Sequence, residues 1–182
     1  MSNRKPPTIL KQETIAKTRI FEVEQMDLRF SNGTEVQYER IRSNPDGAVL
    51  IVPMLDDETV LMIREYAGGV QRYELALPKG RVEKNEDPLV AANREIMEEI
   101  GYASRSLSHL ARLSIAPGYL NHETQIVLAL DLYENRQEGD EPEEIEVVPW
   151  SLHKLDELVA SPECTEARSI AALFIAKQKL LG

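Results

Sequence analysis

The chain has 182 residues, of which 42% are hydrophobic and 29% charged, so it is long enough to bury one core of ordinary globular size. Its formal charge of −10 argues against a broad basic surface that would bind nucleic acid by neutralising phosphates. The longest nearly unbroken apolar run, at residues 48–55, is far shorter than the roughly 18 residues that read as a membrane span. Cys164 is the single cysteine, which rules out an intrachain disulfide and favours the cytoplasm. We therefore expect a cytoplasmic protein that binds neither nucleic acid nor membranes.

Strand patterns dominate the first half of the chain. Residues 19–42 alternate apolar and polar side chains and turn at Asn32-Gly33, a dipeptide suited to a type I′ β-hairpin. Apolar or β-branched segments predict further strands at 48–55, 59–66, 73–77, 107–115 and 124–133.

Helical patterns occur at three places. Pro88 suits the first turn of a helix that runs to about Ile100, where Gly101 provides the stop. Helical spacing returns at 152–160 and at about 165–181. A single mixed α/β domain follows from this order of elements.

The first of these helices carries three acids close together. At about 100° per residue, Glu95, Glu98 and Glu99 share a sector of about 100°. Like charges at this spacing cost about 0.2–0.5 kcal/mol per pair, and a bound divalent cation would remove that cost. The alternative is a solvated acidic helix face with no ligand.

The apolar residues of the same helix predict how it packs. Val90, Met97 and Ile100 cluster on the side of the helical wheel opposite the acids. We therefore expect the acids to face away from the core.

The segment around this helix matches a known motif. Residues 80–102 read GRVEKNEDPLVAANREIMEEIGY and match G-x5-E-x7-R-E-U-x-E-E-x-G-U, where U is a bulky aliphatic residue. This segment resembles the Nudix box, and Tyr102 is the one departure from it. The resemblance implies a Nudix-type α/β/α sandwich with a mixed sheet, together with an N-terminal antiparallel β-sheet.

The resemblance also implies a metal site. Glu95 and Glu99 would be the principal ligands, Glu98 would assist, and the main-chain carbonyl of Lys79 would contribute an oxygen. The ion would be Mg²⁺, with Mn²⁺ as an alternative, because both prefer oxygen ligands. We expect the Lys79 ammonium to be solvated.

Four further residues of the motif have structural roles. Gly80 and Gly101 permit tight turns on either side of the loop and helix. Glu86 and Arg94 can orient the helix through hydrogen bonds and ion pairs.

Beyond the motif, the chain is similar over nearly its whole length to the ADP compounds hydrolases and ADP-ribose pyrophosphatases. That similarity implies hydrolysis of the diphosphate in ADP-linked compounds, namely ADP-ribose, diadenosine polyphosphates and NADH, to give AMP and a phosphorylated product. The segments that carry it are TIL at 8–10, FSNG at 30–33, YERIR at 38–42, IREYA at 63–67, AANRE at 91–95, EGDEPE at 138–143 and EAR at 166–168.

Several residues outside the motif are candidates for contacting the substrate. Pro117 occupies a place that goes with ADP-ribose-type substrates in this family. Ala67 stands where the ADP-ribose pyrophosphatases usually carry a phosphate-binding arginine. Arg64 or Arg72 could supply the missing charge, although each could instead be a solvated arginine at a strand edge.

Two glutamates resemble family positions near the nucleotide. Glu39 in YERIR and Glu74 in YELAL each follow a tyrosine, so their carboxylates could accept from an adenine amine or a ribose hydroxyl. Both could equally be ordinary surface glutamates.

A catalytic base is expected in the acidic run GDEPEEIEV at 139–147. In the ADP-ribose pyrophosphatases the base is a glutamate on a mobile loop at this place, and Glu141 and Glu143 align best with it. The alternatives are a solvated acidic loop, or activation of water by the metal alone.

Family resemblance further divides the chain into two parts. Residues 1–44 would form an N-terminal β-hairpin region for dimerisation, and residues 45–182 the Nudix hydrolase domain. In the implied homodimer, the N-terminal strands cross to the partner. The alternative function is a catalytically silent Nudix domain that binds ADP-ribose-type ligands.

Overall fold

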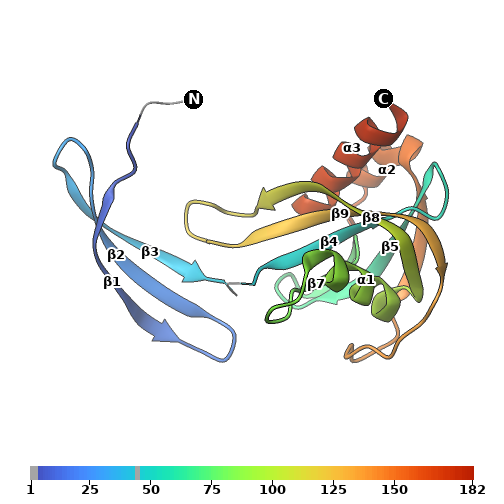
Figure 1. Cartoon of the computed structure of the whole chain (residues 1–182), viewed down its shortest axis with the longest axis horizontal. Coiled ribbons are helices and arrows are strands. Elements are labelled where there is room, and N and C mark those ends of the chain that lie inside the picture. Colours follow the sequence, from blue (N-terminus) through green and yellow to red (C-terminus); the bar gives the residue numbers. More distant parts are fainter. Residues whose placement is uncertain (1–3, 44–45) are drawn as a thin grey trace. The chain divides into compact units, whose positions relative to one another are not determined.

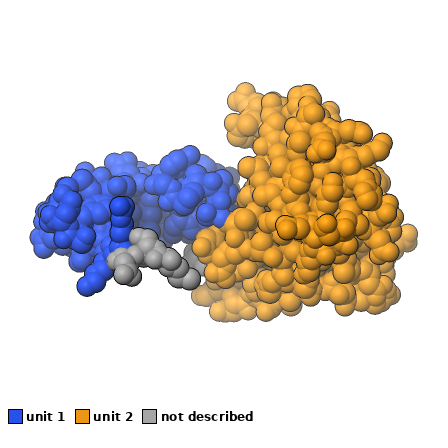
Figure 2. All heavy atoms as spheres, turned by 90° about the horizontal axis from the view of Figure 1, so that it is seen from above, with its two compact units in different colours: residues 1–45, 114–122 blue, residues 46–113, 123–182 orange. Residues whose placement is uncertain are grey.

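The computed structural model describes residues 4–43 and 46–182. They form two compact units, drawn in different colours in Figure 2. Unit 1 contains the described residues up to 43 together with Ser114–His122, and unit 2 contains Asp46–Leu113 and Glu123–Gly182. The expected boundary at residues 44 and 45 lies outside the described residues. The sequence did not predict that Ser114–His122 would belong to unit 1.

Unit 1 is built on a three-stranded antiparallel sheet in the order β1-β2-β3 (Figure 1). The strands are β1 (Thr8–Lys17), β2 (Glu22–Arg29) and β3 (Glu35–Arg42). An N-terminal antiparallel sheet was expected from the family resemblance, and the structure contains it.

The turn between β2 and β3 differs from the predicted type I′ hairpin. Of Asn32 and Gly33, only Gly33 has a positive φ, at 84°, whereas a type I′ turn needs positive φ at both central residues. The carbonyl of Phe30 accepts from the Gly33 N–H, and the side chain of Asn32 accepts from the Thr34 N–H. Asn32 therefore stabilises the loop through its side chain, and the left-handed position falls to Gly33 alone.

Unit 2 contains two sheets, ordered β10-β5-β6 and β7-β4-β9-β8. In the second sheet, β4 pairs in parallel with β9 and antiparallel with β7, so the sheet is mixed. The strands are β4 (Ala48–Pro53), β5 (Thr59–Ala67), β6 (Arg72–Ala76), β7 (Lys79–Arg81), β8 (Tyr102–Ser114), β9 (Glu123–Glu134) and β10 (Glu146–Ser151).

Helices cover both faces of these sheets. The helices are α1 (Pro88–Glu99), the 3₁₀ turn η1 (Leu152–Lys154), α2 (Leu155–Ala160) and α3 (Ala167–Leu181). Because side chains alternate along a strand, Val49 and Ile51 of β4 pack with residues of α1, whereas Leu50 and Val52 pack with residues of α2 and α3. Figure 1 shows α1 and the α2–α3 pair on opposite sides of the sheet strands. The α/β/α sandwich with a mixed sheet is confirmed.

Some elements were not visible in the periodicity of the sequence. The short strands β7 and β10 lie where a loop was expected, and β8 begins at Tyr102 rather than near 107. None of the helices in the described residues is long and apolar enough to cross a membrane.

Candidate active site

The helix α1 begins at the predicted Pro88 and ends before the predicted Gly101, and Asp87 adds an N-cap that was not predicted. The Asp87 carboxylate accepts the Leu89 N–H at 2.8 Å, and Pro88 occupies the first turn. Gly101 follows the helix with a φ of 78°, a conformation that glycine adopts at little cost. These caps fix the two ends of α1, and thereby the positions of its acids along the helix.

The orientation of α1 differs from the prediction that its acids face away from the core. Glu95 and Glu99 are only 8% and 5% exposed, whereas Val90 is 59% exposed. The fully buried residues of the helix are Ala91, Ala92 and Ile96. Alanine side chains allow a helix to pack closely, so the buried face of α1 is centred on Ala91 and Ala92. Glu95 and Glu99 lie at the edge of this face and are therefore buried as well.

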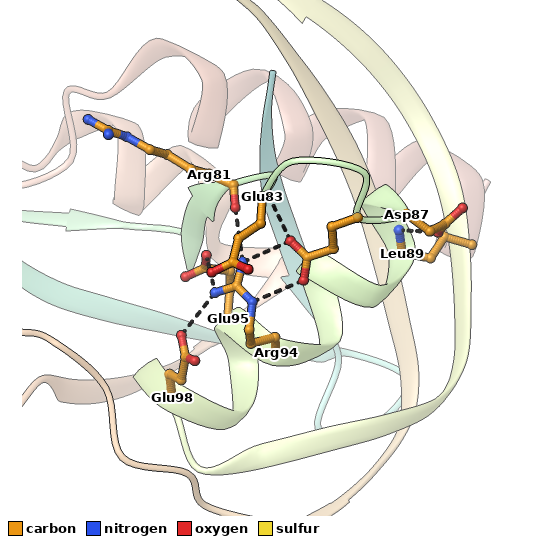
Figure 3. A network of polar contacts seen from close by, with 8 residues as sticks. Arg81, Glu83, Asp87, Leu89, Arg94, Glu95 and Glu98 are labelled. Carbon is orange, nitrogen blue, oxygen red and sulfur yellow. Dashed lines mark hydrogen bonds and ion pairs between the residues drawn. The ribbon is translucent and has the colours of Figure 1, made fainter. Parts of the chain in front are cut away.

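Arg94 connects Glu95 and Glu98 of α1 with Glu86, which precedes the helix (Figure 3). Its Nε and Nη2 donate to the two carboxylate oxygens of Glu86 at 3.0 and 3.1 Å, and Nη2 also donates to the Arg81 carbonyl. Its Nη1 donates to Glu95 at 2.8 Å and to Glu98 at 3.2 Å. The hydrogen bonds with Glu86 raise the pKa of Arg94 and lower the pKa of Glu86, so the pair stays ionised.

Gly80 is required for space and not for a turn. It lies within β7, opposite Val49 of β4, and its φ is not in the left-handed region. A Cβ at this position would overlap the carboxyl group of Glu95. The prediction of a tight turn at Gly80 was wrong, and the glycine instead lets a carboxylate approach the strand backbone closely.

Glu99 is the most deeply placed acid of the site. Burial raises the pKa of its carboxyl to about 8, although the nearby Lys79 opposes the shift. Its Oε2 accepts the main-chain N–H of Lys79 at 3.0 Å. Burial also raises the pKa of Glu95. Two neighbouring buried carboxyls that resist ionisation fit a divalent cation, which would favour their charged forms.

The carboxylates are not already arranged around a common point. Within residues 4–43 and 46–182, no three acidic, histidine or cysteine side chains stand in an arrangement that would hold a metal by itself. Arg94 instead engages Glu95 and Glu98. The metal roles of Glu95, Glu98, Glu99 and the Lys79 carbonyl therefore stay a prediction that rests on the donor chemistry.

The ammonium group of Lys79 is not solvated as expected. Its Nζ pairs with Glu65 Oε2 at 2.5 Å, and its side chain is 25% exposed. Glu65 belongs to the IREYA segment. The alternating strand pattern of that segment did not indicate that Glu65 would pair with Lys79, the residue before the Nudix box.

A cavity of about 450 Å³ opens beside α1, lined by Glu95, Glu98 and Glu99 and by residues 136–145. The acidic segment in which a base was expected therefore forms the second wall of this cavity. Both candidate bases, Glu141 and Glu143, are among its lining residues.

The two candidate bases have different surroundings. Burial, followed by the charges of Glu65 and Asp140, raises the pKa of Glu141. Glu143 instead accepts a hydrogen bond of 2.7 Å from the hydroxyl of Tyr73 on β6. Glu143 is thus anchored, whereas Glu141 faces the other acids of the site.

The arginines suggested for substrate phosphate are engaged elsewhere in unit 2. Arg64 pairs with Glu146 at 2.6 Å and with Glu163 at 3.1 Å. Arg72 donates to Glu74 at 2.5 Å and to the Thr165 hydroxyl at 2.9 Å. These contacts join β5 and β6 to other segments of unit 2, and neither arginine lines the cavity.

The remaining substrate candidates lie in different parts of the chain. Glu74 is 6% exposed, and its carboxylate accepts from Thr165 and Arg72, which indicates a structural role. Glu39 lies opposite Gln25 in the β2–β3 ladder, and Pro117 lies in the Ser114–His122 segment of unit 1.

Comparison with family models covers almost the whole chain. Residues 7–40 match the NudE-type Nudix hydrolase N-terminal domain, and residues 44–174 match the NUDIX domain. The two matched ranges meet near residues 41–43, at the end of β3.

Individual proteins are similar over comparable lengths. The ADP compounds hydrolase NudE of Escherichia coli (strain K12) is 46% identical over 176 residues, which cover 97% of this chain and 94% of that protein. The ADP-ribose pyrophosphatase of Bacillus subtilis (strain 168) is 30% identical over 90% of this chain and 91% of its own length. A crystal structure of an ADP compounds hydrolase superposes with a TM-score of 0.92 at 44% identity, covering 100% of this chain and 98% of that one.

Proposed function

This chain belongs to the Nudix hydrolase family, and from that membership we propose that it hydrolyses the diphosphate of ADP-linked compounds to AMP and a phosphorylated product. The candidate substrates are ADP-ribose, diadenosine polyphosphates and NADH. The observation that carries the proposal is the cavity in which the acids of the Nudix box face the acidic segment 136–145. The similarity to an ADP compounds hydrolase of E. coli and an ADP-ribose pyrophosphatase of B. subtilis supports this substrate class.

The reaction requires a divalent cation, for which we propose Mg²⁺, with Mn²⁺ as the alternative. Glu95, Glu98 and Glu99 would hold it together with the main-chain carbonyl of Lys79. Such an ion, when bound, neutralises diphosphate charge and lowers the pKa of water.

Within the protein, we propose that Glu141 is the catalytic base. Its carboxylate would accept the proton of the water that attacks a phosphorus of the diphosphate, while the bond from that phosphorus to the bridging oxygen breaks. The support is geometric: both glutamates line the cavity of the box acids, but the carboxylate of Glu143 is engaged by the Tyr73 hydroxyl. Arg94 would hold Glu95 and Glu98 in place through its bonds to them and to Glu86.

Of the four candidate substrate residues, we keep Glu39 and Pro117. The buried hydrogen bonds of Glu74 and the two ion pairs of Arg64 support structural roles for those two residues instead. Because Glu39 and Pro117 both belong to unit 1, their proposed role depends on how unit 1 takes part in the assembled enzyme.

We also propose that the protein is a homodimer in which unit 1 contacts the second copy. A three-stranded sheet needs a packed apolar face to be stable, yet unit 1 exposes Ile9 by 54%, Ile15 by 46% and Phe21 by 51%. Analytical ultracentrifugation should give twice the chain mass of 20.6 kDa. Ile15→Glu should weaken the dimer, and a monomeric wild type at micromolar concentration would overturn the assignment.

For location we propose the cytoplasm. Cys164 is free and 2% exposed, and burial raises the pKa of its thiol to about 11, so it is kept as an unreactive thiol. A single reduced cysteine suits a reducing compartment.

Release of AMP from a panel of ADP-ribose, NADH and diadenosine tetraphosphate tests the function. We expect turnover with Mg²⁺ or Mn²⁺ and none with EDTA. Glu99→Gln should lower kcat on the order of a hundredfold while the far-UV circular dichroism stays that of the wild type. Tight binding of ADP-ribose with no AMP release would favour the silent binding domain, which the complete set of box acids does not support.

A further inference from the structure

Arg136 follows β9 and is held against the C-terminal end of α1. The main-chain N–H of Asn135 donates to the Gly101 carbonyl at 3.0 Å, and that of Gln137 donates to the Met97 carbonyl at 3.1 Å. These two bonds flank Arg136 and fix its backbone. Its guanidinium lies over Gly101, where an added Cβ would meet Nε at 3.0 Å. The last glycine of the Nudix box therefore leaves space for this side chain.

The charge of the cavity makes the position of Arg136 unusual. Thirteen of the described residues line the cavity; eight of them are acidic, and Arg136 alone is basic. A diphosphate entering such a cavity meets strong repulsion wherever no metal ion neutralises the acids. A cation among the lining residues would reduce that repulsion.

Two other basic side chains near the acids, those of Arg94 and Lys79, are already paired. Arg94 bonds to Glu86, Glu95 and Glu98, and Lys79 pairs with Glu65. For Arg136, in contrast, the described part of the chain provides no hydrogen bond or ion pair to the guanidinium. Arg136 lines both the acidic cavity and a smaller hollow beside Gly101, so its unengaged donors are within reach of a ligand that enters the cavity.

We propose that Arg136 binds a phosphate group of the substrate and supplies the positive charge that Ala67, Arg64 and Arg72 do not. A guanidinium presents its N–H groups in a planar fork that matches two phosphate oxygens. Arg136 is a substrate-binding residue in this assignment and takes no part in proton transfer. The assignment rests on the proposed function, because it needs a phosphorylated substrate in this cavity.

If Arg136 only stabilised the fold, its removal would have a different effect. A cation at the end of a helix is stabilised by the helix dipole, and Arg136 lies beside the last turn of α1. If that were its whole role, its removal would lower the thermal stability and leave substrate affinity unchanged.

Steady-state kinetics with ADP-ribose at saturating Mg²⁺ separate these roles. R136Q should raise KM about tenfold to a hundredfold with kcat within about threefold of the wild type. R136K keeps the positive charge but loses the planar set of N–H donors, so its KM should lie between those of the wild type and R136Q. R112Q removes one charge from an arginine whose side chain is 59% exposed and which does not line the cavity, and its KM should equal that of the wild type.

Several results would overturn the assignment. A KM for both R136Q and R136K within about twofold of the wild type would do so, with or without a lower Tm. If the wild type releases no AMP, the proposed function fails, and Arg136 is judged by calorimetric binding of ADP-ribose with Mg²⁺. Equal Kd values for wild type and R136Q, or no binding by the wild type, would then reject the phosphate role.

Discussion

The hydroxyl of Tyr73 donates a hydrogen bond of 2.7 Å to the carboxylate of Glu143, and this bond joins the end of β6 to the acidic wall of the cavity. The bond also raises the pKa of Tyr73, so its proton stays in place across the neutral range. Tyr73 packs edge-on against Tyr66, its cross-strand neighbour, with ring centroids 5.6 Å apart. The position of Glu143, and of Glu141 two residues before it, thus depends on a tyrosine pair of the β5–β6 hairpin.

This division of roles predicts different outcomes for the two loop glutamates. Glu141→Gln removes the proton acceptor and should lower kcat by a factor on the order of 10² to 10⁴. Glu143→Gln keeps an oxygen that can accept from Tyr73, so kcat should fall less than about fivefold. Measured kcat values at saturating Mg²⁺ check both, and a larger loss for Glu143→Gln would transfer the base role to that residue.

Tyr73→Phe should loosen the acidic wall without removing any group that acts on the substrate. We expect kcat to fall about threefold to tenfold, since the lost hydrogen bond is worth about 0.7–1.4 kcal/mol. Faster hydrogen exchange in residues 136–145 should accompany the loss. Tyr66→Phe is the control, because no hydrogen bond in the described residues depends on its hydroxyl. Unchanged exchange in Tyr73→Phe would mean that the bond does not hold the wall.

Gly80→Ala should disturb the metal site directly. The added methyl group would occupy the place of the Glu95 carboxyl, so that carboxyl must leave its position beside β7. We expect Mg²⁺ affinity, measured by titration of activity, to fall at least about tenfold. Gly69→Ala is a matched control, because no described atom lies within 4 Å of an added Cβ there and its φ is not left-handed. Equal Mg²⁺ dependence in the two variants would contradict the spatial role of Gly80.

Acid stability should depend on Glu166, which caps α3. Burial raises the pKa of this carboxyl, but its bonds to Arg168 and Ser169 outweigh burial, and the net pKa is lowered. A lowered pKa means that the stabilisation is present above the ordinary value of 4.5 and is lost as the pH falls through the folded value. Glu166→Gln should therefore cost about 1 kcal/mol at pH 7, and the difference from wild type should shrink below pH 4.5.

Chemical denaturation at several pH values measures this effect. Glu157→Gln is the control, because Glu157 is 66% exposed and its substitution should change the free energy of unfolding by less than about 0.5 kcal/mol. A difference that grows on acidification would contradict the sign of the Glu166 shift.

The sequence predicted the elements of the site better than their orientation. The motif located α1, its two ends and its acids, because helix start and stop signals and spacing act locally. The helical wheel, however, treated Val90 as core and the acids as exposed. Ala91 and Ala92 decided the packing instead, since the close approach they allow depends on the sheet beneath the helix.

Sequence patterns did not predict which side chains far apart in the sequence would pair. The bonds of Glu74 to Thr165, of Arg64 to Glu163 and of Lys79 to Glu65 join strands to segments that only the folded chain brings together. The same holds for Arg136, whose place over Gly101 depends on two main-chain bonds to the end of α1. A single sequence contains no local signal for such contacts.

The strands β4 and β9 pair in parallel although α1 and β8 lie between them in the sequence. This part of the sheet therefore cannot form until β9 has left the ribosome. α1 is synthesised between these strands, so its acids exist before the sheet that shields them can close. Non-local pairing of this kind is slow and leaves apolar surface uncovered in the meantime. The acidic wall at 136–145 and the strand β10 emerge later still. When β9 has just left the ribosome, the nascent chain therefore contains every proposed metal ligand but only one wall of the cavity.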